Sequence, residues 1–274
     1  MITNLGIGYS GRIGNQLFQY AVCYAQSKRL GVEFVIPQEN VENTKNDGCY
    51  DFTTNDWIPY RFLLYDCFEI TAKTKKNIIT KNIFQEPHFH YTPSIDYIQD
   101  DTSLQGYYQS EKYFLDYKQS ILSEFTFKPK IINNCNNIIS NFKNNEIVAI
   151  HIRRGDYLIN SNVSLLEIDY FQKAINYFCD KEYNFLIISD DINWCKIIFP
   201  ENYNIRFVEK TTDFEDLCLM SLANHNIISN STFSWWGAYL NKNKDKKIIA
   251  PNDWFKDKIN KNTKDLIPKN WIII

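Results

Sequence analysis

The sequence predicts an α/β fold with parallel sheets. Apolar, strand-like segments alternate with helix-like segments along the whole chain of 274 residues, which is the pattern of α/β proteins. In the second half one plan recurs: an apolar strand, a polar turn at its carboxyl end, and then a helix. The chain is 44% hydrophobic, which suffices for one large core or two modest ones.

The first elements are bounded by residues that favour turns. Residues 1–10 predict a short strand, and a glycine loop leads from it into a helix over about 15–30. Gly31 is a typical helix stop, and residues 31–37 predict a second strand that Pro37 ends.

The region 38–103 is less regular. It contains two aromatic clusters, at 57–68 and 86–91, and residues 104–114 lead into another helix. The polar, Asn-rich segment 128–146 predicts a helix with flanking loops at a boundary between two lobes, which we place at 1–145 and 146–274.

The second half contains the clearest elements. Strands, some running into polar turns, are expected at 146–157, 183–191, 203–209, the start of 227–240 and 246–251. Helices are expected at 168–181, 213–226 and the end of 227–240. Ligands of open parallel sheets bind outside the carboxyl ends of the strands. The polar turns 151–157, 189–191 and 229–234 are therefore expected to converge on one binding site.

Charge and composition exclude several classes of protein. The net charge of −2 gives no basic excess for nucleic acid. The seven cysteines are odd in number and show no CxxC spacing, which argues against a disulfide framework and a zinc site. No signal peptide is apparent at the start, and no apolar run reaches the roughly 20 residues of a membrane span. We expect a cytoplasmic protein that is soluble or, at most, peripherally associated with the inner face of a membrane.

The strongest motif is HIRRGDY at 151–157. A strand ending in two arginines can hold a planar guanidinium against phosphate oxygens. In group transfer from a nucleotide sugar, the leaving diphosphate gains negative charge, which a fixed arginine stabilises in the transition state. Asp156 is expected either to orient the guanidinium or to accept a proton. The alternative is a structural Arg–Asp ion pair on a loop.

Two further turns carry polar groups. In SNSTFSWWG at 229–237, four hydroxyl side chains lie at a helix start, where backbone N–H groups bind anions; the alternative is an ordinary N-cap. In ISDD at 188–191, a carboxylate can accept hydrogen bonds from the N–H edge of a guanine base. Asp190 and Asp191 are adjacent and would point to opposite faces, so we expect one base-binding carboxylate and no metal. A helix N-cap before residue 192 is the competing interpretation.

The N-terminal segment GIGYSGRIGNQLFQYA spells GxGxxG but lacks the context of a dinucleotide fingerprint, because no acidic residue ends its second strand. Residues 11–16 instead predict a turn that exposes Asn15 and Gln16 at a helix start. Any of the four histidines could act as a catalytic base, although a histidine side chain is more commonly packed in the core or solvated.

Taken together, these motifs resemble the α-1,2-fucosyltransferase family (bacterial glycosyltransferase family 11 type). The matching segments are GRIGNQLFQYA, LQGYYQSEKYF, HIRRGDY, ISDD and SNSTFSWWGAYL, in order over residues 11–240. The resemblance implies a GT-B type fold, with two Rossmann-like lobes facing a central cleft. The lobe 1–145 would be the acceptor side and the lobe 146–274 would bind GDP-fucose. It also implies inverting transfer without a metal or other cofactor, GDP-fucose being the donor substrate.

By this resemblance Arg153 would hold the pyrophosphate, with His151 and Arg154 supporting it, and Asp190 would bind guanine. Donor contacts are also expected from Ser231, Thr232, Phe233, Ser234 and Gly14. Asn15 would lie near the reacting sugar, and Gln109 and Glu111 on the acceptor side. The default acceptor is a terminal β-galactoside of an oligosaccharide or lipid-linked surface glycan of the O-antigen type.

Some alternatives stay open. The catalytic base is Asp156, Glu111 or a donor phosphate oxygen. A fucosyltransferase with another acceptor or linkage, a non-catalytic carbohydrate-binding protein and an NAD-dependent oxidoreductase are the competing functions. The last rests on GxGxxG alone.

Overall fold

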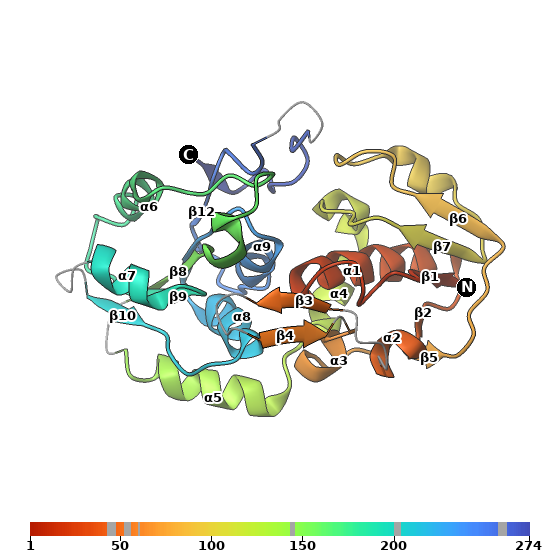
Figure 1. Cartoon of the computed structure of the whole chain (residues 1–274), viewed down its shortest axis with the longest axis horizontal. Helices are drawn as coiled ribbons and strands as arrows, with labels where there is room; N and C mark the ends of the chain where they lie inside the picture. Colours follow the sequence, from red (N-terminus) through yellow and green to blue (C-terminus); the bar gives the residue numbers. More distant parts are fainter. Residues whose placement is uncertain (43–47, 52–55, 60, 143–145, 200–203, 257–261) are drawn as a thin grey trace. The chain divides into compact units, whose positions relative to one another are not determined.

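In the computed structural model the chain divides into two compact units (Figure 1). Unit 1 comprises residues 1–50, 57–126 and 258–268, and unit 2 comprises 51–56, 127–257 and 269–274. The structure describes residues 1–42, 48–51, 56–59, 61–142, 146–199, 204–256 and 262–274. The lobe boundary predicted at 145/146 stays a prediction, and each unit is described by itself.

Unit 1 is built around a three-stranded parallel sheet with the order β1-β7-β6. Its strands are Ile2–Thr3 (β1), Thr102–Gln105 (β7) and Asn82–Gln85 (β6). A second parallel pair joins β2 (Val35–Pro37) to β5 (Lys73–Lys75). β3 (Gly48–Asp51) and β4 (Asp56–Pro59) form a separate two-stranded sheet. The helices of unit 1 are Ile13–Leu30 (α1), Gln38–Glu42 (α2), Leu64–Cys67 (α3) and Lys118–Glu124 (α4), with 3₁₀ turns at Pro93–Tyr97, Glu111–Tyr113 and Leu115–Tyr117.

Helix α1 ends as the sequence predicts and begins two residues earlier than predicted. Gly31 adopts a left-handed conformation, with φ 64°, and its N–H closes the last turn. At the other end Arg12 is the extended N-cap residue, so the helix begins at Ile13. Gly11, with φ 99°, is required just before it, because a Cβ there would lie 2.2 Å from Nδ2 of Asn15.

Unit 2 contains a six-stranded parallel sheet with the order β10-β9-β8-β11-β12-β13. In chain order its strands are Ile147–Ile152 (β8), Asn184–Ser189 (β9), Ile205–Phe207 (β10), His225–Ile227 (β11), Ile248–Ala250 (β12) and Ile272–Ile273 (β13). Its helices are Pro129–Ile139 (α5), Ile168–Ile175 (α6), Ile192–Ile198 (α7), Asp213–Leu222 (α8) and Thr232–Tyr239 (α9), with a 3₁₀ turn at Gly155–Leu158. The sequence therefore predicts the α/β type of this unit and the order of most of its elements; α7 entered only as a competing interpretation, and β13 was missed.

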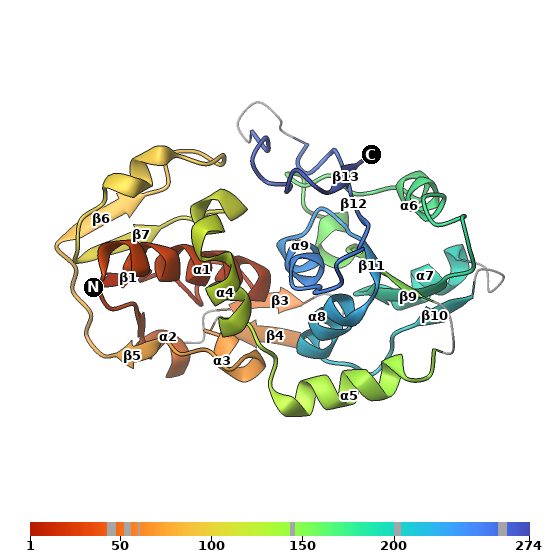
Figure 2. The same ribbon diagram turned by 180° about the vertical axis from the view of Figure 1, so that it is seen from behind.

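Both faces of the unit 2 sheet are covered by helices, which is why β8 is buried along its whole length. Figures 1 and 2 show α6 and α7 on one face and α5, α8 and α9 on the other. Alternate residues of β8, including Val148 and Ile150, pack with Phe171 of α6 and Cys195 of α7. On the other face α8 and α9 cross closely, because Gly237 leaves room for the side chain of Met220.

Several boundaries differ from the sequence prediction. Helix α6 ends at Ile175 rather than 181, and α8 ends at Leu222 rather than 226. Residues 225–227 form β11 instead, because pairing with β8 and β12 satisfies their backbone groups. The short strand β13, which pairs with β12, was not predicted; two residues carry no periodicity to detect.

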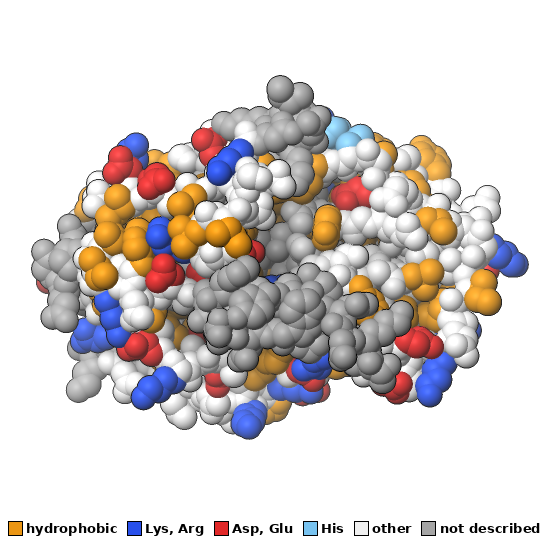
Figure 3. Space-filling model, in the orientation of Figure 1, with side chains coloured by type: hydrophobic (Ala, Val, Ile, Leu, Met, Phe, Trp, Pro, Cys, Tyr) orange, Lys and Arg blue, Asp and Glu red, His pale blue; other side chains and the backbone are white. Residues whose placement is uncertain are grey.

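Two surface and core features agree with the composition. The described cysteines 23, 67, 135, 179, 195 and 218 are all free, and each except Cys179 is buried. On the face that Figure 3 shows, basic and acidic side chains are interspersed rather than gathered into a stripe of one sign.

Candidate active site

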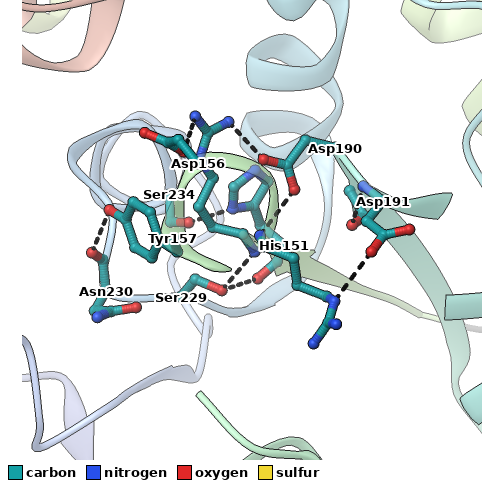
Figure 4. Close-up of polar contacts among 11 residues, drawn as sticks. His151, Asp156, Tyr157, Asp190, Asp191, Ser229, Asn230 and Ser234 are labelled. Atoms are coloured by element: carbon teal, nitrogen blue, oxygen red, sulfur yellow. Dashed lines mark hydrogen bonds and ion pairs between the residues drawn. The ribbon is translucent and has the colours of Figure 1, made fainter. Parts of the chain in front are cut away.

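Polar residues gather at the carboxyl ends of three neighbouring strands in unit 2. β9, β8 and β11 lie side by side, and the chain leaves them at Asp190, Arg153 and Ser229. Figure 4 shows the polar contacts among residues of the three turns, including Asp190 and Ser229. The predicted convergence of the three polar turns is therefore confirmed.

Arg153 lies between two carboxylates. Its Nη1 lies 2.8 Å from Oδ2 of Asp190, and its Nη2 donates to Oδ1 of Asp156 at 2.6 Å. Its backbone N–H donates to the hydroxyl of Ser229 at 3.0 Å. Burial by itself would lower the pKa of Arg153, but the two carboxylates outweigh it and the pKa is raised. The guanidinium is thus a fixed, permanent cation at the end of β8.

Asp190 contacts the arginine loop with both oxygens, through an ion pair on Oδ2 and a hydrogen bond on Oδ1. Besides Arg153, it accepts the backbone N–H of Arg154 on Oδ1 at 2.8 Å, and its side chain is 14% exposed. Burial raises the pKa of Asp190, while Arg153 and the backbone N–H groups of Arg154 and Gly155 oppose the rise. The carboxylate therefore positions the loop in this structure, and the expected contact with guanine stays a prediction.

Asp191 serves the next helix. Its Oδ1 accepts the backbone N–H of Trp194 at 3.2 Å and caps α7, which confirms the competing N-cap interpretation for this residue. Its Oδ2 accepts Nε of Arg154 at 3.1 Å. The guanidinium carbon of Arg154 lies 3.8 Å from the ring centroid of Trp194, a cation–π contact that fixes the side chain against α7.

His151 is a packed histidine beneath the arginine loop. It is 5% exposed, its Nδ1 is hydrogen-bonded to the hydroxyl of Ser234, and its ring centroid lies 5.1 Å from that of Phe233. Burial, with a smaller contribution from the charge of Arg153, lowers the pKa of His151 to about 3. The imidazole is therefore neutral near pH 7 and holds the serine turn against β8.

The serine turn joins β11 to α9. The Ser229 hydroxyl donates to the carbonyl of His151 at 2.8 Å and accepts the N–H of Arg153. Ser231 is the N-cap residue of α9, but its side chain does not cap the helix. Thr232 begins the helix, whose first-turn N–H groups have no acceptor within the helix. An uncapped helix start on the strand next to Arg153 is suited to bind an anion.

Two residues of this site had no role predicted from the sequence. The Tyr157 hydroxyl donates to the carbonyl of Asn230 at 3.0 Å, and its ring centroid lies 5.7 Å from the guanidinium carbon of Arg153. Burial raises the pKa of Tyr157 to about 12. Asn230 donates to the carbonyls of Ser164 and Trp254 at 2.7 and 2.9 Å. Both lie inside the quoted motifs, but only the fold shows that they hold the turns together.

Unit 1 contains the remaining predicted site residues. Gly14 and Asn15 lie in the first turn of α1, and Gln109 donates from Nε2 to Oδ1 of Asn15 at 3.0 Å. The carboxylate of Glu111 lies 3.8 Å from Nζ of Lys118. The structure thus brings Asn15 and Gln109 together, although 94 positions separate them.

The glycine loop before α1 differs from one expectation and agrees with another. Gln16 is buried rather than exposed, because its side chain bonds the carbonyl of Arg61 and the N–H of Leu63 at 2.9 and 2.8 Å. Four loop N–H groups, those of Gly6, Ile7, Tyr9 and Ser10, donate to oxygens within the loop itself. Such a loop has few N–H groups to offer a diphosphate, which agrees with the low weight given to GxGxxG.

Among the described residues, no group of three or more His, Cys, Asp or Glu side chains is arranged so that it could hold a metal ion.

Known proteins similar to this chain are glycosyltransferases. The model of glycosyl transferase family 11 matches residues 3–274. An α-1,2-colitosyltransferase of Escherichia coli is 32% identical, over 97% of this chain and 97% of its own. The O-antigen biosynthesis glycosyltransferase WbnK of E. coli is 29% identical, over 96% of this chain and 98% of its own. The galactoside 2-α-L-fucosyltransferase SEC1 of Bos taurus is 27% identical over 85% of this chain, which corresponds to 63% of the bovine protein.

A solved structure supports the fold. The crystal structure of POFUT1 in complex with GDP-fucose matches with a TM-score of 0.52 at 14% identity, covering 87% of this chain and 93% of the other. At that identity the match shows a shared α/β fold and no more. The family model, by contrast, spans nearly the whole chain, including every polar turn described above, and the chain belongs to glycosyl transferase family 11.

Proposed function

We propose that this enzyme transfers L-fucose from GDP-β-L-fucose to the 2-hydroxyl of a terminal β-galactoside, with inversion and without a metal. One observation carries the proposal: in a family 11 chain, Arg153 is fixed at a strand end next to the uncapped start of α9. The names of the relatives, which specify 1,2-linked transfer, galactosides and O-antigen synthesis, support the linkage, the acceptor and the surface glycan.

The chemistry assigned to Arg153 follows from its two partners. Asp190 is 14% exposed and Asp156 is 43% exposed, so Asp156 is the partner that an incoming diphosphate can displace. Nη2 then turns from Asp156 to a phosphate oxygen, while Asp190 keeps the guanidinium oriented. Charge that develops on the leaving GDP meets a cation that is already in place, so little reorganisation opposes the transition state.

The remaining predicted roles are part of the proposal. Ser231, Thr232, Phe233 and Ser234 contact the donor through the start of α9. Asn15 and Gly14 lie near the reacting sugar, and Gln109 and Glu111 on the acceptor side. The lobes 1–145 and 146–274 would take acceptor and donor in a GT-B arrangement. The base that deprotonates the acceptor hydroxyl is Asp156, Glu111 or a donor phosphate oxygen.

The decisive assay measures fucose transfer from GDP-fucose to a panel of β-galactosides, with the product linkage determined by NMR. We expect 1,2-linked product, undiminished by EDTA. Arg153→Ala should reduce turnover by more than 100-fold with an unchanged far-UV circular dichroism spectrum. Arg206→Ala, which removes an exposed arginine on β10 of the same unit, is the control and should retain parental turnover.

Turnover of Arg153→Ala within tenfold of the parent would sink the proposed role of Arg153, and a strict requirement for Mn²⁺ would indicate a different transferase chemistry. A carbohydrate-binding protein without activity would bind galactosides and ignore GDP in a calorimetric titration.

A second donor is favoured by one observation. A relative named a colitosyltransferase is 32% identical over nearly all of both chains. Colitose is fucose without its 3-hydroxyl, so the two donors differ by one hydrogen-bonding group. A site that hydrogen-bonds that hydroxyl rejects the deoxy sugar strongly, whereas a site that lacks the contact accepts both. The ratio of kcat/KM for GDP-fucose and GDP-colitose therefore decides between the donors.

The location follows from the proposed substrates. We propose a cytoplasmic enzyme that meets a lipid-linked or oligosaccharide acceptor at the inner face of the membrane, by peripheral association. Among the described residues, no helix is both long and apolar enough to cross a bilayer.

A further inference from the structure

Unit 1 contains a cavity of about 320 Å³ at the carboxyl end of its parallel sheet. We call it the amide pocket, and the side chains that define it are Asn4, Ser10, Gln19, Gln85, Gln105 and Tyr107. Asn4 follows the last residue of β1, while Gln85 and Gln105 are the last residues of β6 and β7. Ligands of parallel sheets bind at this edge, so its position is that of a binding site.

The lining of the amide pocket is polar and uncharged. Four of its side chains are amides, one is a hydroxyl, and Tyr107 adds an aromatic ring. Among its described lining residues no Lys or Arg is present to neutralise a phosphate, and no Asp or Glu to hold a cation. An amide both donates and accepts hydrogen bonds, as does every sugar hydroxyl, and an aromatic face packs against the C–H face of a sugar ring.

Two side chains of the pocket lack hydrogen-bond partners for one atom each. Within the described part of the chain, Nδ2 of Asn4 and Oε1 of Gln19 are unpaired, although both residues are at least 98% buried. A buried polar atom without a partner costs about 1–3 kcal/mol. One of these atoms is a donor and the other an acceptor, so a ligand hydroxyl, or a water that it holds, can satisfy both.

The loop that carries Tyr107 is fixed before any ligand binds. Gln19 donates from Nε2 to the carbonyl of Gly106 at 3.1 Å. The carboxylate of Glu86 accepts the N–H groups of Tyr107 and Tyr108 at 2.8 and 3.0 Å. Gly106 has φ 150°, and a Cβ there would lie 2.4 Å from the Cβ of Glu86. A rigid loop spares a ligand the entropic cost of ordering it.

The amide pocket adjoins the residues that the proposed function assigns to the reacting sugars. Asn15 and Gln19 are four residues apart on α1 and so lie on the same face of that helix. Gln109 bonds Asn15, and its Oε1 is unpaired within the described residues. A row of amides therefore leads along α1 from the pocket to Asn15.

We propose that the amide pocket binds one neutral pyranose ring of the acceptor glycan, with Tyr107 packing on the ring and the amides bonding its hydroxyls. The volume lies at the low end of the range for small-molecule sites, about 300–1,000 Å³, which fits a single ring better than a long glycan. The identification of this sugar as the acceptor rests on the proposed function, whereas the binding of a neutral sugar does not.

The test uses the full chain and methyl β-D-galactopyranoside and lactose as probes. Binding is followed by saturation-transfer NMR with and without saturating GDP, and transfer kinetics are measured with GDP-fucose. Tyr107→Ala and Gln85→Ala remove exposed side chains of the pocket. Tyr97→Ala is the matched control, because Tyr97 is 84% exposed in the same unit and does not line the pocket.

We expect Tyr107→Ala to weaken sugar binding and to raise KM for the acceptor about tenfold, with kcat and GDP affinity little changed. Tyr97→Ala should match the parent. Asn4→Asp keeps the acceptor for the Gly6 N–H and replaces only the unpaired donor, so it should also weaken sugar binding.

Sugar binding that is equal in the parent, Tyr107→Ala and Gln85→Ala, or absent with and without GDP, would overturn the inference. If the proposed donor is wrong instead, transfer from GDP-fucose will fail while the sugar signal and its sensitivity to Tyr107→Ala remain. The two failures are therefore distinguishable.

Discussion

At the scale of single residues, the unit 2 site depends on how Arg153 is held. A guanidinium on a loop samples many rotamers, and a cation that must be ordered during the reaction stabilises the transition state less. Here Asp190 and Asp156 hold it from two sides, and Ser229 holds its backbone. The two carboxylates of the motifs thus orient the guanidinium of Arg153.

Asp190→Asn separates two roles for this residue. The amide can still accept the N–H of Arg154, but its NH₂ group faces the donors of Arg153, so we expect Arg153 to lose its orientation. If Asp190 only positions Arg153, the affinities for GDP and for IDP should fall by the same factor, about 10- to 100-fold. The value of kcat/KM should fall by a similar factor. IDP lacks the 2-amino group of guanine. If Asp190 binds guanine instead, the preference for GDP over IDP will disappear in the variant. Calorimetric titration with both nucleotides decides.

At the scale of elements, helix starts act as fixed groups around the site. Helix α7 is capped by Asp191, which also binds Arg154 through its second oxygen. Helix α9 starts at Thr232, and its N-cap residue Ser231 provides no side-chain cap. One helix start is thus capped by a side chain of the protein, and the other is not.

Variants at Asp191 test whether capping or charge matters for stability. Asp191→Ala removes the cap of α7 and should lower the free energy of unfolding by about 1 kcal/mol. Asp191→Asn keeps an oxygen for the Trp194 N–H and should cost only a few tenths, because the partly exposed ion pair with Arg154 contributes little. Urea unfolding measures the free energy of unfolding of both variants. Equal decreases in the two variants would show that the ion pair, and not the cap, stabilises the fold.

Helix α8 contains a carboxylate whose burial links stability to pH. Asp216 accepts a hydrogen bond from Thr211 at 2.6 Å, and burial, reinforced by Asp213 and Glu215, raises its pKa to about 7. The folded state therefore binds more protons than the unfolded state between about pH 4 and 7. The contribution of this group favours folding at low pH and is lost as pH rises through 7.

Asp216→Asn removes that titration while keeping an acceptor for Thr211. The difference in free energy of unfolding, variant minus parent, should increase by at least about 1 kcal/mol from pH 5 to pH 8. Thermal melts of both proteins at the two pH values measure the difference. An offset that is the same at pH 5 and pH 8 would contradict a raised pKa at this position.

At the scale of the whole molecule, the described chain is two α/β units, each with polar groups at the carboxyl ends of its parallel strands. In unit 2 these groups are arginines and hydroxyls, suited to a diphosphate. In unit 1 they are amides beside an aromatic ring, suited to a neutral sugar. Each unit thus matches the charge of one of the two substrates that a glycosyltransferase brings together.

Binding of GDP should stabilise the folded chain by linkage. At a concentration about 100-fold above its Kd, GDP should add about 2.7 kcal/mol and raise Tm by about 5–10 °C. EDTA should leave the shift unchanged, and Arg153→Ala should abolish most of it. A Tm that does not respond to GDP in the parent would exclude a nucleotide site in the folded chain.

By itself the sequence determined the fold class, the order of elements in unit 2 and the motifs that meet at its site. These features depend on local periodicity and on the rule that parallel strands present their carboxyl ends at one edge. Tertiary structure alone decided which oxygen meets which donor: that Asp190 holds Arg153, that Asp191 binds Arg154, that Gln16 is buried, and that Asn15 lies against Gln109. Such pairings, like the amide pocket, join residues tens of positions apart, and their geometry is set by packing rather than by any pattern within one segment.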